Sequence, residues 1–255
     1  MRFRAFHDMT STQKERHLMD SIPKVAVITG ASQGIGAGLV AAYRKLGYAV
    51  VATSRNIAES DDPMVLTVPG DIGQPGVGAA IIDAAIARFG RVDTLVNNAG
   101  IFVSKPFTDY TNDDYDAVMG VNVRGFFEVS RAAVRAMLSR DSGGHLVNVS
   151  TSLVDQASSE VPAALASLSK GGLNAVTKAL AVEYASRGIR SNAVALGIIR
   201  TPMHDPSTHE ALAALHPMGQ LGDVDDVVDA ILYLETASFV TGEILHVDGG
   251  QSAGH

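Results

Sequence analysis

A glycine-rich turn is the first part of the chain with the composition to bind a charged ligand. Residues 29–36 read Thr-Gly-Ala-Ser-Gln-Gly-Ile-Gly and separate an apolar run at 24–29 from an amphipathic run at 35–46. Glycine lets such a turn be tight and lets its backbone approach a pyrophosphate, which then sits at the positive end of the following helix. An ordinary tight turn could have the same composition, but its placement between a strand and a helix favours phosphate binding.

A run of three hydroxyl side chains could act on a polar substrate. Ser150, Thr151 and Ser152 directly follow an apolar run at 145–149, so we expect them at the end of a strand. Either Thr151 or Ser152 could polarise a carbonyl group through its hydroxyl. The alternative is that these side chains only form local hydrogen bonds that cap the strand.

Short apolar segments alternate with amphipathic ones, and this pattern predicts the elements that position those residues. Strands are expected at 24–29, 48–53, 65–68, 94–96, 145–149, 190–195 and 243–247. Helices are expected at 35–46, 77–89, 112–138, 164–186 and 223–234, the last with Asp223 as its N-cap, and a short helical lid at 197–222. Almost wholly apolar strands indicate a parallel sheet that is buried on both faces. With right-handed crossovers, residues 23–255 form one α/β domain, a Rossmann-type doubly wound sheet of about seven strands whose ligands bind beyond the carboxyl ends of the strands.

The spacing of the glycines, three residues between the first two and one between the last two, resembles that of the short-chain dehydrogenase/reductase family. Further matching segments follow in order over about residues 23–250: Asp71-Ile72, Asn97-Asn98-Ala99-Gly100, Asn122, Ser150-Thr151-Ser152, Lys170, Gly-Ile-Ile-Arg-Thr-Pro at 197–202 and Val-Thr-Gly-Glu at 240–243. The resemblance implies an oxidoreductase that uses a nicotinamide cofactor and acts on a carbonyl or an alcohol.

The resemblance also implies which residues hold the cofactor. Asp71 and Ile72 are expected to contact the adenine, residues 97–100 to line the ribose and the nicotinamide, and Thr201 to hold the carboxamide. The expected cofactor-binding residues are Gly30, Ser32, Gln33, Gly34, Ile35, Gly36, Ser54, Arg55, Asp71, Ile72, Asn97, Ala99, Gly100, Lys170, Gly197, Ile199 and Thr201. A helix-capping role for Asp71 and a structural role for Asn97 are the alternatives.

The choice between NAD and NADP is expected at the end of the second strand, where residues 52–56 read Ala-Thr-Ser-Arg-Asn. No carboxylate is present there to accept hydrogen bonds from the 2′-hydroxyl of NAD. Arg55 can instead pair with a 2′-phosphate, helped by Ser54 or Ser32. An exposed arginine is often only a solvated charge, and Gln33 stands where many NADP-preferring relatives have a basic residue. We expect NADP as the cofactor rather than NAD.

By the same resemblance, the expected catalytic residues are Lys170, Asn122 and either Thr151 or Ser152. In the family, a tyrosine four residues before the lysine donates a proton to the carbonyl oxygen, and the lysine ammonium lowers the pKa of that tyrosine. Position 166 is alanine here, and residues 160–170 contain no tyrosine. Tyr184 lies fourteen residues beyond the lysine, about 21 Å along a helix, and is too far away to replace it.

The missing tyrosine leaves several hypotheses open. Loss of a general acid typically lowers a rate by roughly 10² to 10⁴. Ser167, Ser169, His204, Glu160 or a water held by Thr151 could supply the proton instead. The leading hypothesis is an NADP(H)-dependent oxidoreductase with an altered general acid. The alternatives are a redox-silent nucleotide-binding protein, such as a regulatory subunit, and a non-redox lyase or isomerase.

Composition narrows the possible partners. The net charge of −7 argues against nucleic acid, because phosphate binding needs a dense cationic face. The chain has no cysteine, which excludes disulfides and cysteine metal sites, and we expect no metal. No apolar run reaches about 18 residues and the first twenty residues lack an apolar segment, so we expect a cytoplasmic protein without a membrane span. Residues 1–22 are expected to form a flexible extension, and the resemblance implies a homodimer or homotetramer that acts on a small molecule.

Overall fold

A seven-stranded parallel sheet lies at the centre of the computed structural model, which describes residues 23–254. The strand order is β3-β2-β1-β4-β5-β6-β7, so the chain reverses its direction of winding between β3 and β4. The strands are β1 (Val25–Thr29), β2 (Ala49–Ser54), β3 (Val65–Pro69), β4 (Thr94–Asn97), β5 (Gly144–Thr151), β6 (Ile189–Leu196) and β7 (Ile244–Val247). This topology confirms the predicted doubly wound fold, and its parallel strands all end at one edge, which we call the carboxyl edge.

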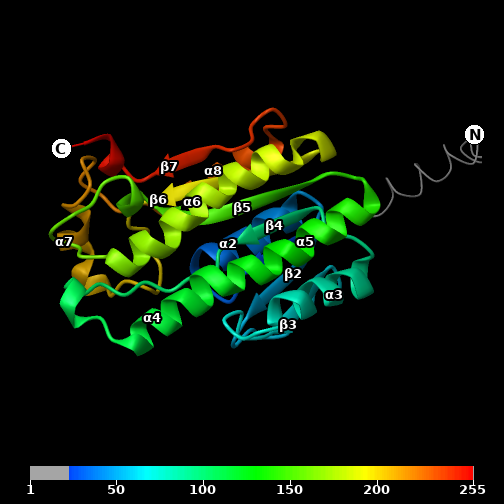
Figure 1. Cartoon of the computed structure of the whole chain (residues 1–255), viewed down its shortest axis with the longest axis horizontal. Coiled ribbons are helices and arrows are strands. Elements are labelled where there is room, and N and C mark those ends of the chain that lie inside the picture. The colour runs from blue at the N-terminus through cyan, green and yellow to red at the C-terminus, as the bar shows by residue number, and fades with distance from the viewer. Residues whose placement is uncertain (1–22, 255) are drawn as a thin grey trace, which may run out of the picture.

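Helices cover both faces of the sheet, and Figure 1 shows α5 and α6 lying side by side across one of them. The helices are α2 (Gly34–Lys45), α3 (Val77–Phe89), α4 (Asn112–Met119), α5 (Phe126–Arg140), α6 (Ala164–Tyr184), α7 (His209–Ala213) and α8 (Val224–Thr236). Alternate residues of a strand point to opposite faces. In β1, Ala26 and Ile28 therefore pack with α2 and α8, whereas Val25 and Val27 pack with α3 and α5. Among residues 23–254, no helix is both long and apolar enough to cross a membrane.

The prediction of one long helix at 112–138 is wrong in one respect, because a π-helical turn at Gly120–Gly125 divides the helix. Glycine at both ends of this turn weakens the regular helix. At Gly125 the chain also approaches Ile72 so closely that an added Cβ would lie 2.8 Å from the Ile72 carbonyl oxygen. π-helical turns inside longer helices often occur at functional sites, and this one buries the side chain of Asn122.

The other helix boundaries follow the sequence closely. Asp223 is the N-cap of α8, as predicted, and it forms a capping box with Asp226. The predicted lid at 197–222 contains only α7 and one 3-10 turn at Pro206–Thr208. The predicted N-terminal extension, residues 1–22, lies outside the described residues.

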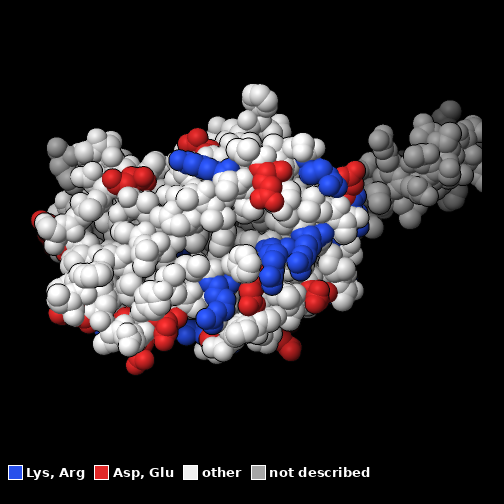
Figure 2. All heavy atoms as spheres, viewed as in Figure 1, with Lys and Arg blue, Asp and Glu red and all other residues white. Residues whose placement is uncertain are grey.

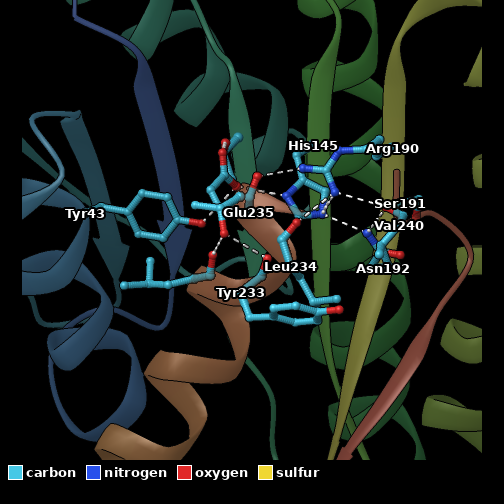
Figure 3. Close-up of polar contacts among 12 residues, drawn as sticks. Tyr43, His145, Arg190, Ser191, Asn192, Tyr233, Leu234, Glu235 and Val240 are labelled. Carbon is cyan, nitrogen blue, oxygen red and sulfur yellow. Dashed lines mark hydrogen bonds and ion pairs between the residues drawn. The ribbon is translucent and has the colours of Figure 1, made fainter. Parts of the chain in front are cut away.

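A buried polar network holds together the opposite edge of the sheet, where the strands begin (Figure 3). The Glu235 carboxylate, near the end of α8, accepts hydrogen bonds from the hydroxyls of Tyr48 at 2.8 Å, Thr94 at 3.0 Å and Tyr43 at 3.2 Å. His145 Nδ1, on β5, lies 2.8 Å from the same carboxylate. Burial alone would raise the pKa of Glu235, but the hydrogen bonds that it accepts from His145, Tyr48 and Thr94 hold this pKa at about 2.

The donors around the His145 ring show which of its nitrogens carries the proton. Asn192 Nδ2 lies 3.0 Å from His145 Nε2, and the backbone N–H of Glu243 fixes the amide orientation by donating to Asn192 Oδ1. Arg190 Nη1, which is always a donor, lies 3.4 Å from the same ring nitrogen. Nε2 must therefore accept, and Nδ1 must donate to Glu235. Burial lowers the pKa of His145, which keeps the imidazole neutral.

This network predicts that acid destabilises the protein. Because the pKa of His145 is lower in the folded state than its ordinary value of 6.5, the unfolded state binds more protons below that pH. The contribution of His145 is fully present above pH 6.5 and is lost as the pH falls toward the lower folded value, with a slope of up to about 1.4 kcal/mol per pH unit. Urea unfolding between pH 5.5 and 7.5 measures this slope.

The matched variant is His145→Gln, which has no titration in this range. We expect its free energy of unfolding to vary less steeply with pH than that of the wild type, whatever its absolute stability. Equal slopes for the two proteins would contradict the role of His145 in the pH dependence.

Candidate functional site

The glycine-rich turn connects β1 to α2 at the carboxyl edge, and it packs against the end of β4. Gly30 and Gly34 have φ angles of +67° and +53°, which disfavour a side chain. An added Cβ at Gly36 would lie 2.1 Å from the Gly30 carbonyl oxygen, and one at Gly30 would lie 2.9 Å from Ala99 Cα. Asn98 Nδ2 closes the contact by donating to the carbonyl oxygens of Thr29 and Gly30. These glycines are therefore required by close packing.

The first turn of α2 is open to an anion. Its N-cap, Gln33, makes no side-chain capping hydrogen bond, and the first turn carries no acidic residue. Ser32 and Gln33 are exposed, while Ile35 is half-buried and packs on the core beside α8. The free N–H groups and the helix dipole favour a phosphate group at this position.

The end of β2 offers hydrogen-bonding groups that have no partner among the described residues. The Thr53 and Ser54 hydroxyls are buried and unpaired. Arg55 follows on the surface, and no hydrogen bond or ion pair joins it to another described residue. Together with the open helix end, these groups fit the phosphate-bearing, adenosine half of a dinucleotide.

Asp71 and Ile72 follow β3 and have structural contacts. Asp71 Oδ1 accepts a hydrogen bond from the Gly73 N–H at 3.0 Å, and the side chain stays half-exposed. Ile72 is buried in the core on the α3 and α5 side of the sheet. Asp71 thus shapes the turn after β3, and its second carboxylate oxygen has no hydrogen-bond partner among the described residues.

The residues from Asn97, the last of β4, to Gly100 divide into a buried part and a part at the surface of the site. Asn97 is only 4% exposed, and its Nδ2 donates to Ser130 Oγ at 3.0 Å and to Asn148 Oδ1 at 2.8 Å. It therefore joins β4, β5 and α5 from inside the fold. Ala99 and Gly100 are half-buried and lie beyond the strand end, where a ligand can reach them.

The side chains of Lys170 and Asn122 both approach Gly100. An added Cβ at Gly100 would lie 3.2 Å from Lys170 Nζ and 3.4 Å from Asn122 Oδ1, so glycine keeps the space between the two side chains open. The Lys170 ammonium donates to the Val149 carbonyl oxygen at 2.7 Å. Burial lowers the pKa of Lys170 from 10.5 to about 8.

Asn122 is held by its neighbours. Its Oδ1 accepts from the Ile101 N–H at 2.9 Å, and its Nδ2 donates to the Ile101 carbonyl oxygen at 3.0 Å and to Ser169 Oγ at 3.2 Å. The π-helical turn aims the side chain at these partners. The sequence identified the residue but not the turn, because a π-helical turn has no distinctive composition.

The two candidate hydroxyls at the end of β5 have different surroundings. The Ser152 side chain is fully buried, and its Oγ lies 2.6 Å from Gln251 Oε1 and 3.1 Å from the Leu196 carbonyl oxygen. Thr151 is half-buried, and its Oγ1 accepts from the Leu153 N–H at 3.3 Å. Thr151 can therefore still donate its hydroxyl proton to a ligand, whereas Ser152 connects the strand to the C-terminal turn.

Ala166 is buried on the first turns of α6 and packs with Leu153, Ala163 and Val161. These apolar neighbours also line a cavity of about 240 Å³ that extends to Lys105 and Phe107. A second cavity of about 380 Å³ lies between residues 156–160, Ala214 and Leu215 of the lid, and Gln251. Apolar side chains therefore surround the position where the family has its tyrosine.

The lid is attached to the site at both of its ends. Ile199 is buried and pairs with Gly222, and Thr201 Cγ2 lies 3.3 Å from the position of a Cβ on Gly34. Gly197 is needed because a Cβ there would lie 2.7 Å from His216 Nε2. Thr201 thus touches the glycine-rich turn, next to the open end of α2.

His216 positions the lid, and sequence reasoning missed it. Its Nε2 accepts from the Ile198 N–H at 2.9 Å, and its Nδ1 lies 3.2 Å from the Leu212 carbonyl oxygen. No motif marks this residue, since its partners are backbone groups that only the tertiary structure brings close. His204, by contrast, is half-buried farther along the lid, and burial lowers its pKa.

Fold and site together define a dinucleotide-binding protein of the Rossmann type, and comparison with known proteins identifies its family. The family model described as enoyl-(acyl carrier protein) reductase matches residues 30–252. The chain is 36% identical over 246 residues to 3beta-hydroxysteroid dehydrogenase 1 of Eggerthella lenta, covering 90% of this chain and 94% of that protein. It is 35% identical over 237 residues to L-xylulose reductase of Bos taurus, covering 88% and 95%. The structure of ElxO with NADP bound superposes with a TM-score of 0.84 at 30% identity, covering 91% of this chain and all of ElxO. The chain belongs to the short-chain dehydrogenase/reductase family.

The packing of the glycine-rich turn predicts that Gly36→Ala destabilises the protein. The added methyl group has no room beside the Gly30 carbonyl, so the turn must shift. We expect the free energy of unfolding to fall by about 1 to 3 kcal/mol, as for other overpacked sites. Thermal or urea unfolding measures it.

Gly172→Ala is the matched control, because this glycine is also helical but exposed, with nothing within 4 Å of an added Cβ. Helix propensity predicts that it leaves the protein unchanged or up to about 1 kcal/mol more stable. The same small effect for Gly36→Ala would contradict the close packing.

Proposed function

We propose that the chain is an NADP(H)-dependent oxidoreductase that interconverts a small-molecule carbonyl and an alcohol, with an altered general acid. The observation that carries this proposal is the grouping of Lys170 Nζ and Asn122 Oδ1 around Gly100, beside the glycine-rich turn. A nicotinamide cofactor bound there would supply or accept a hydride. The relatives named above are a dehydrogenase and a reductase, which supports redox activity over the lyase and isomerase alternatives.

Residues along the carboxyl edge could bind the successive parts of a nicotinamide dinucleotide. The turn at 30–36 and the open end of α2 would hold the pyrophosphate, and Ser54 and Arg55 would hold the adenosine half. Lys170 would bind the nicotinamide ribose from beside Gly100, and Thr201 would face the carboxamide from the lid. Asp71 and Ile72 would lie beside the adenine.

NADP is the better fit at the end of β2. Arg55 is exposed, and neither it nor the buried Ser54 hydroxyl beside it has a partner within the described part of the chain, so both can bind a 2′-phosphate. No carboxylate stands at residues 52–56 to favour the free 2′-hydroxyl of NAD. That NADP is bound in the ElxO structure supports the same choice.

Replacement of Arg55 by alanine tests this choice. A charge-assisted hydrogen bond to phosphate contributes about 1.5 to 3 kcal/mol, so we expect the Kd for NADPH to rise about 10- to 100-fold. The Kd for NADH should stay within about twofold, since NADH lacks the 2′-phosphate. Cofactor fluorescence measures both constants.

Arg88→Ala is the control, because Arg88 is an exposed arginine on α3 that donates to the Pro63 carbonyl oxygen and lies over the Phe89 ring. It should leave both constants unchanged. An equal loss of NADPH and NADH binding in Arg55→Ala would show that the arginine does not bind the 2′-phosphate.

Thr151 is the hydroxyl that we assign to the substrate. Its oxygen accepts from the Leu153 N–H, which leaves the hydroxyl proton free to polarise a carbonyl oxygen. Ser152 instead positions the end of β5 through Gln251. Asn122, fixed by Ile101 and Ser169, would orient a water next to Lys170.

The altered general acid follows from the alanine at position 166. Ser167 Oγ donates to the Leu153 carbonyl oxygen and Glu160 is exposed in the loop before α6, and both observations argue against either residue as a replacement for the tyrosine hydroxyl. Carbonyl reduction by the wild type should therefore be slow relative to a tyrosine-containing site. We expect the site to lack only the tyrosine hydroxyl at position 166.

Ala166→Tyr tests this prediction directly. We expect the rate of NADPH-dependent reduction of a carbonyl panel to rise by up to about 10² to 10⁴, the usual contribution of a general acid. Absorbance of the reduced nicotinamide measures the rate. Ala166→Phe is the matched control, because it displaces the apolar neighbours in the same way without adding a hydroxyl.

The two variants separate the hypotheses. A gain for tyrosine but not for phenylalanine supports the proposed reductase. No gain for either, with substrate converted at constant nicotinamide absorbance, would identify a non-redox enzyme. NADPH binding without turnover in all three proteins would identify a redox-silent binding protein.

Self-association is a further part of the proposal. Helices α5 and α6 expose the apolar side chains of Phe127, Leu168 and Val182, the last with 82% of its surface accessible. On the face that carries these helices, large areas are free of charged side chains, and the Lys and Arg side chains present are mixed with Asp and Glu (Figure 2). This surface favours a homodimer or homotetramer and gives no dense cationic patch for nucleic acid. The expected cytoplasmic location stays a prediction.

A further inference from the structure

Reduction of a carbonyl needs a proton that Ala166 cannot give. Hydride adds to the carbonyl carbon, and the oxygen must then receive a proton to become a hydroxyl. The donor must lie at the carboxyl edge near Thr151 and must lose a proton near neutral pH. The described residues around Ala166 offer few such groups.

The serine hydroxyls on α6 are already used inside the protein. Ser169 is 1% exposed, and its Oγ lies 3.2 Å from the Ala166 carbonyl oxygen and 3.2 Å from the Asn122 amide that donates to it. Ser167 Oγ donates to the Leu153 carbonyl oxygen at 3.2 Å. Both hydroxyls therefore satisfy backbone groups, and an alkyl hydroxyl does not ionise near neutral pH.

The Lys170 ammonium has N–H groups that can still donate a hydrogen bond or a proton. Of its three N–H groups, one has a hydrogen-bond partner among residues 23–254, the Val149 carbonyl oxygen at 2.7 Å. Gly100 leaves the space in front of Nζ open, since an added Cβ there would lie only 3.2 Å away. Asn122 Oδ1 borders the same space from the π-helical turn. The ammonium thus faces the place where the substrate and the nicotinamide ribose would meet.

We infer that Lys170 itself is the proton donor that replaces the missing tyrosine, an inference that rests on the proposed reductase function. Its ammonium gives one proton to the oxygen of the bound carbonyl, directly or through one bridging water, as hydride from NADPH adds to the carbon. The products are the alcohol, NADP⁺ and a neutral Lys170 amine. The amine then regains a proton from water beside Asn122.

The surroundings of Lys170 suit this role. The groups that face Nζ are the Val149 carbonyl on β5, Gly100 after β4 and Asn122 in the π-helical turn, and none of them titrates. Burial lowers the pKa of Lys170 to about 8, and no ionised group of the described residues contributes to the shift. An acid with this pKa is mostly charged at pH 7 yet releases its proton readily.

The pH dependence of reduction tests the inference. Because the donor must be protonated, kcat at saturating NADPH should fall about tenfold per pH unit above pH 8. Lys170→Arg keeps a cation for the ribose but has no proton to give at these pH values. We expect it to bind NADPH within about fivefold of the wild type, to lose about 10² to 10⁴ in kcat, and to show no break near pH 8.

Lys178→Arg is the matched control, since Lys178 lies on the same helix with its side chain exposed. It should keep both the wild-type kcat and the pH profile. Lys170→Ala provides a second test that does not depend on how arginine fits. Added methylammonium should restore part of its kcat, with a pH profile that follows the pKa of the added amine.

Different results would overturn the role of Lys170 and the proposed reductase function. Wild-type reduction with a flat profile to pH 9.5 and Lys170→Arg within threefold in kcat would overturn the role of Lys170 while the reductase stands. If Lys170→Arg loses NADPH binding, the amine rescue decides, and absence of rescue overturns the inference. NADPH binding without any turnover by the wild type would overturn the reductase as well.

Discussion

The close contact between the glycine-rich turn and the end of β4 is the constraint on which the rest of the site depends. Gly36 and Gly30 bring two backbone segments together more closely than any side chain allows, and the Asn98 amide fixes them by hydrogen bonds to Thr29 and Gly30. This contact puts the glycine-rich turn next to Ala99, the residue before Gly100. As a result, a helix end without a side-chain cap and the Lys170 ammonium lie along one edge of the sheet, an arrangement that suits a dinucleotide.

The two edges of the sheet have different physical roles. Where the strands begin, a network around Glu235 and His145 satisfies its buried polar groups and joins α8 to β4, β5 and β6. Where the strands end, the Ser54 hydroxyl and the Arg55 guanidinium have no partner in the described chain. One edge therefore fastens a helix to the strands, while the other keeps polar groups available for a ligand. A buried polar group without a partner favours the binding of a molecule that forms a hydrogen bond with it.

Much of the fold was predictable because the signals are local. Apolar runs marked all seven strands, and the capping residue Asp223 marked the start of α8. The π-helical turn at Gly120–Gly125 was not predictable, since it depends on the approach of Gly125 to Ile72. At the site, the sequence left Thr151 and Ser152 as equal candidates. Only the contact of Ser152 with Gln251, ninety-nine positions away, separates them.

By itself the sequence determined the doubly wound fold, the family, the glycine-rich turn and the alanine at position 166, because each depends on residue type and spacing along the chain. The tertiary structure decided which side chains are free to act. It turned Asn97 inward, paired the hydroxyls of Ser167 and Ser169 with backbone groups, and left the Lys170 ammonium with N–H groups to donate. Burial and hydrogen-bond partners come from residues far apart in the chain, so they exist only once the sheet and its helices have packed together.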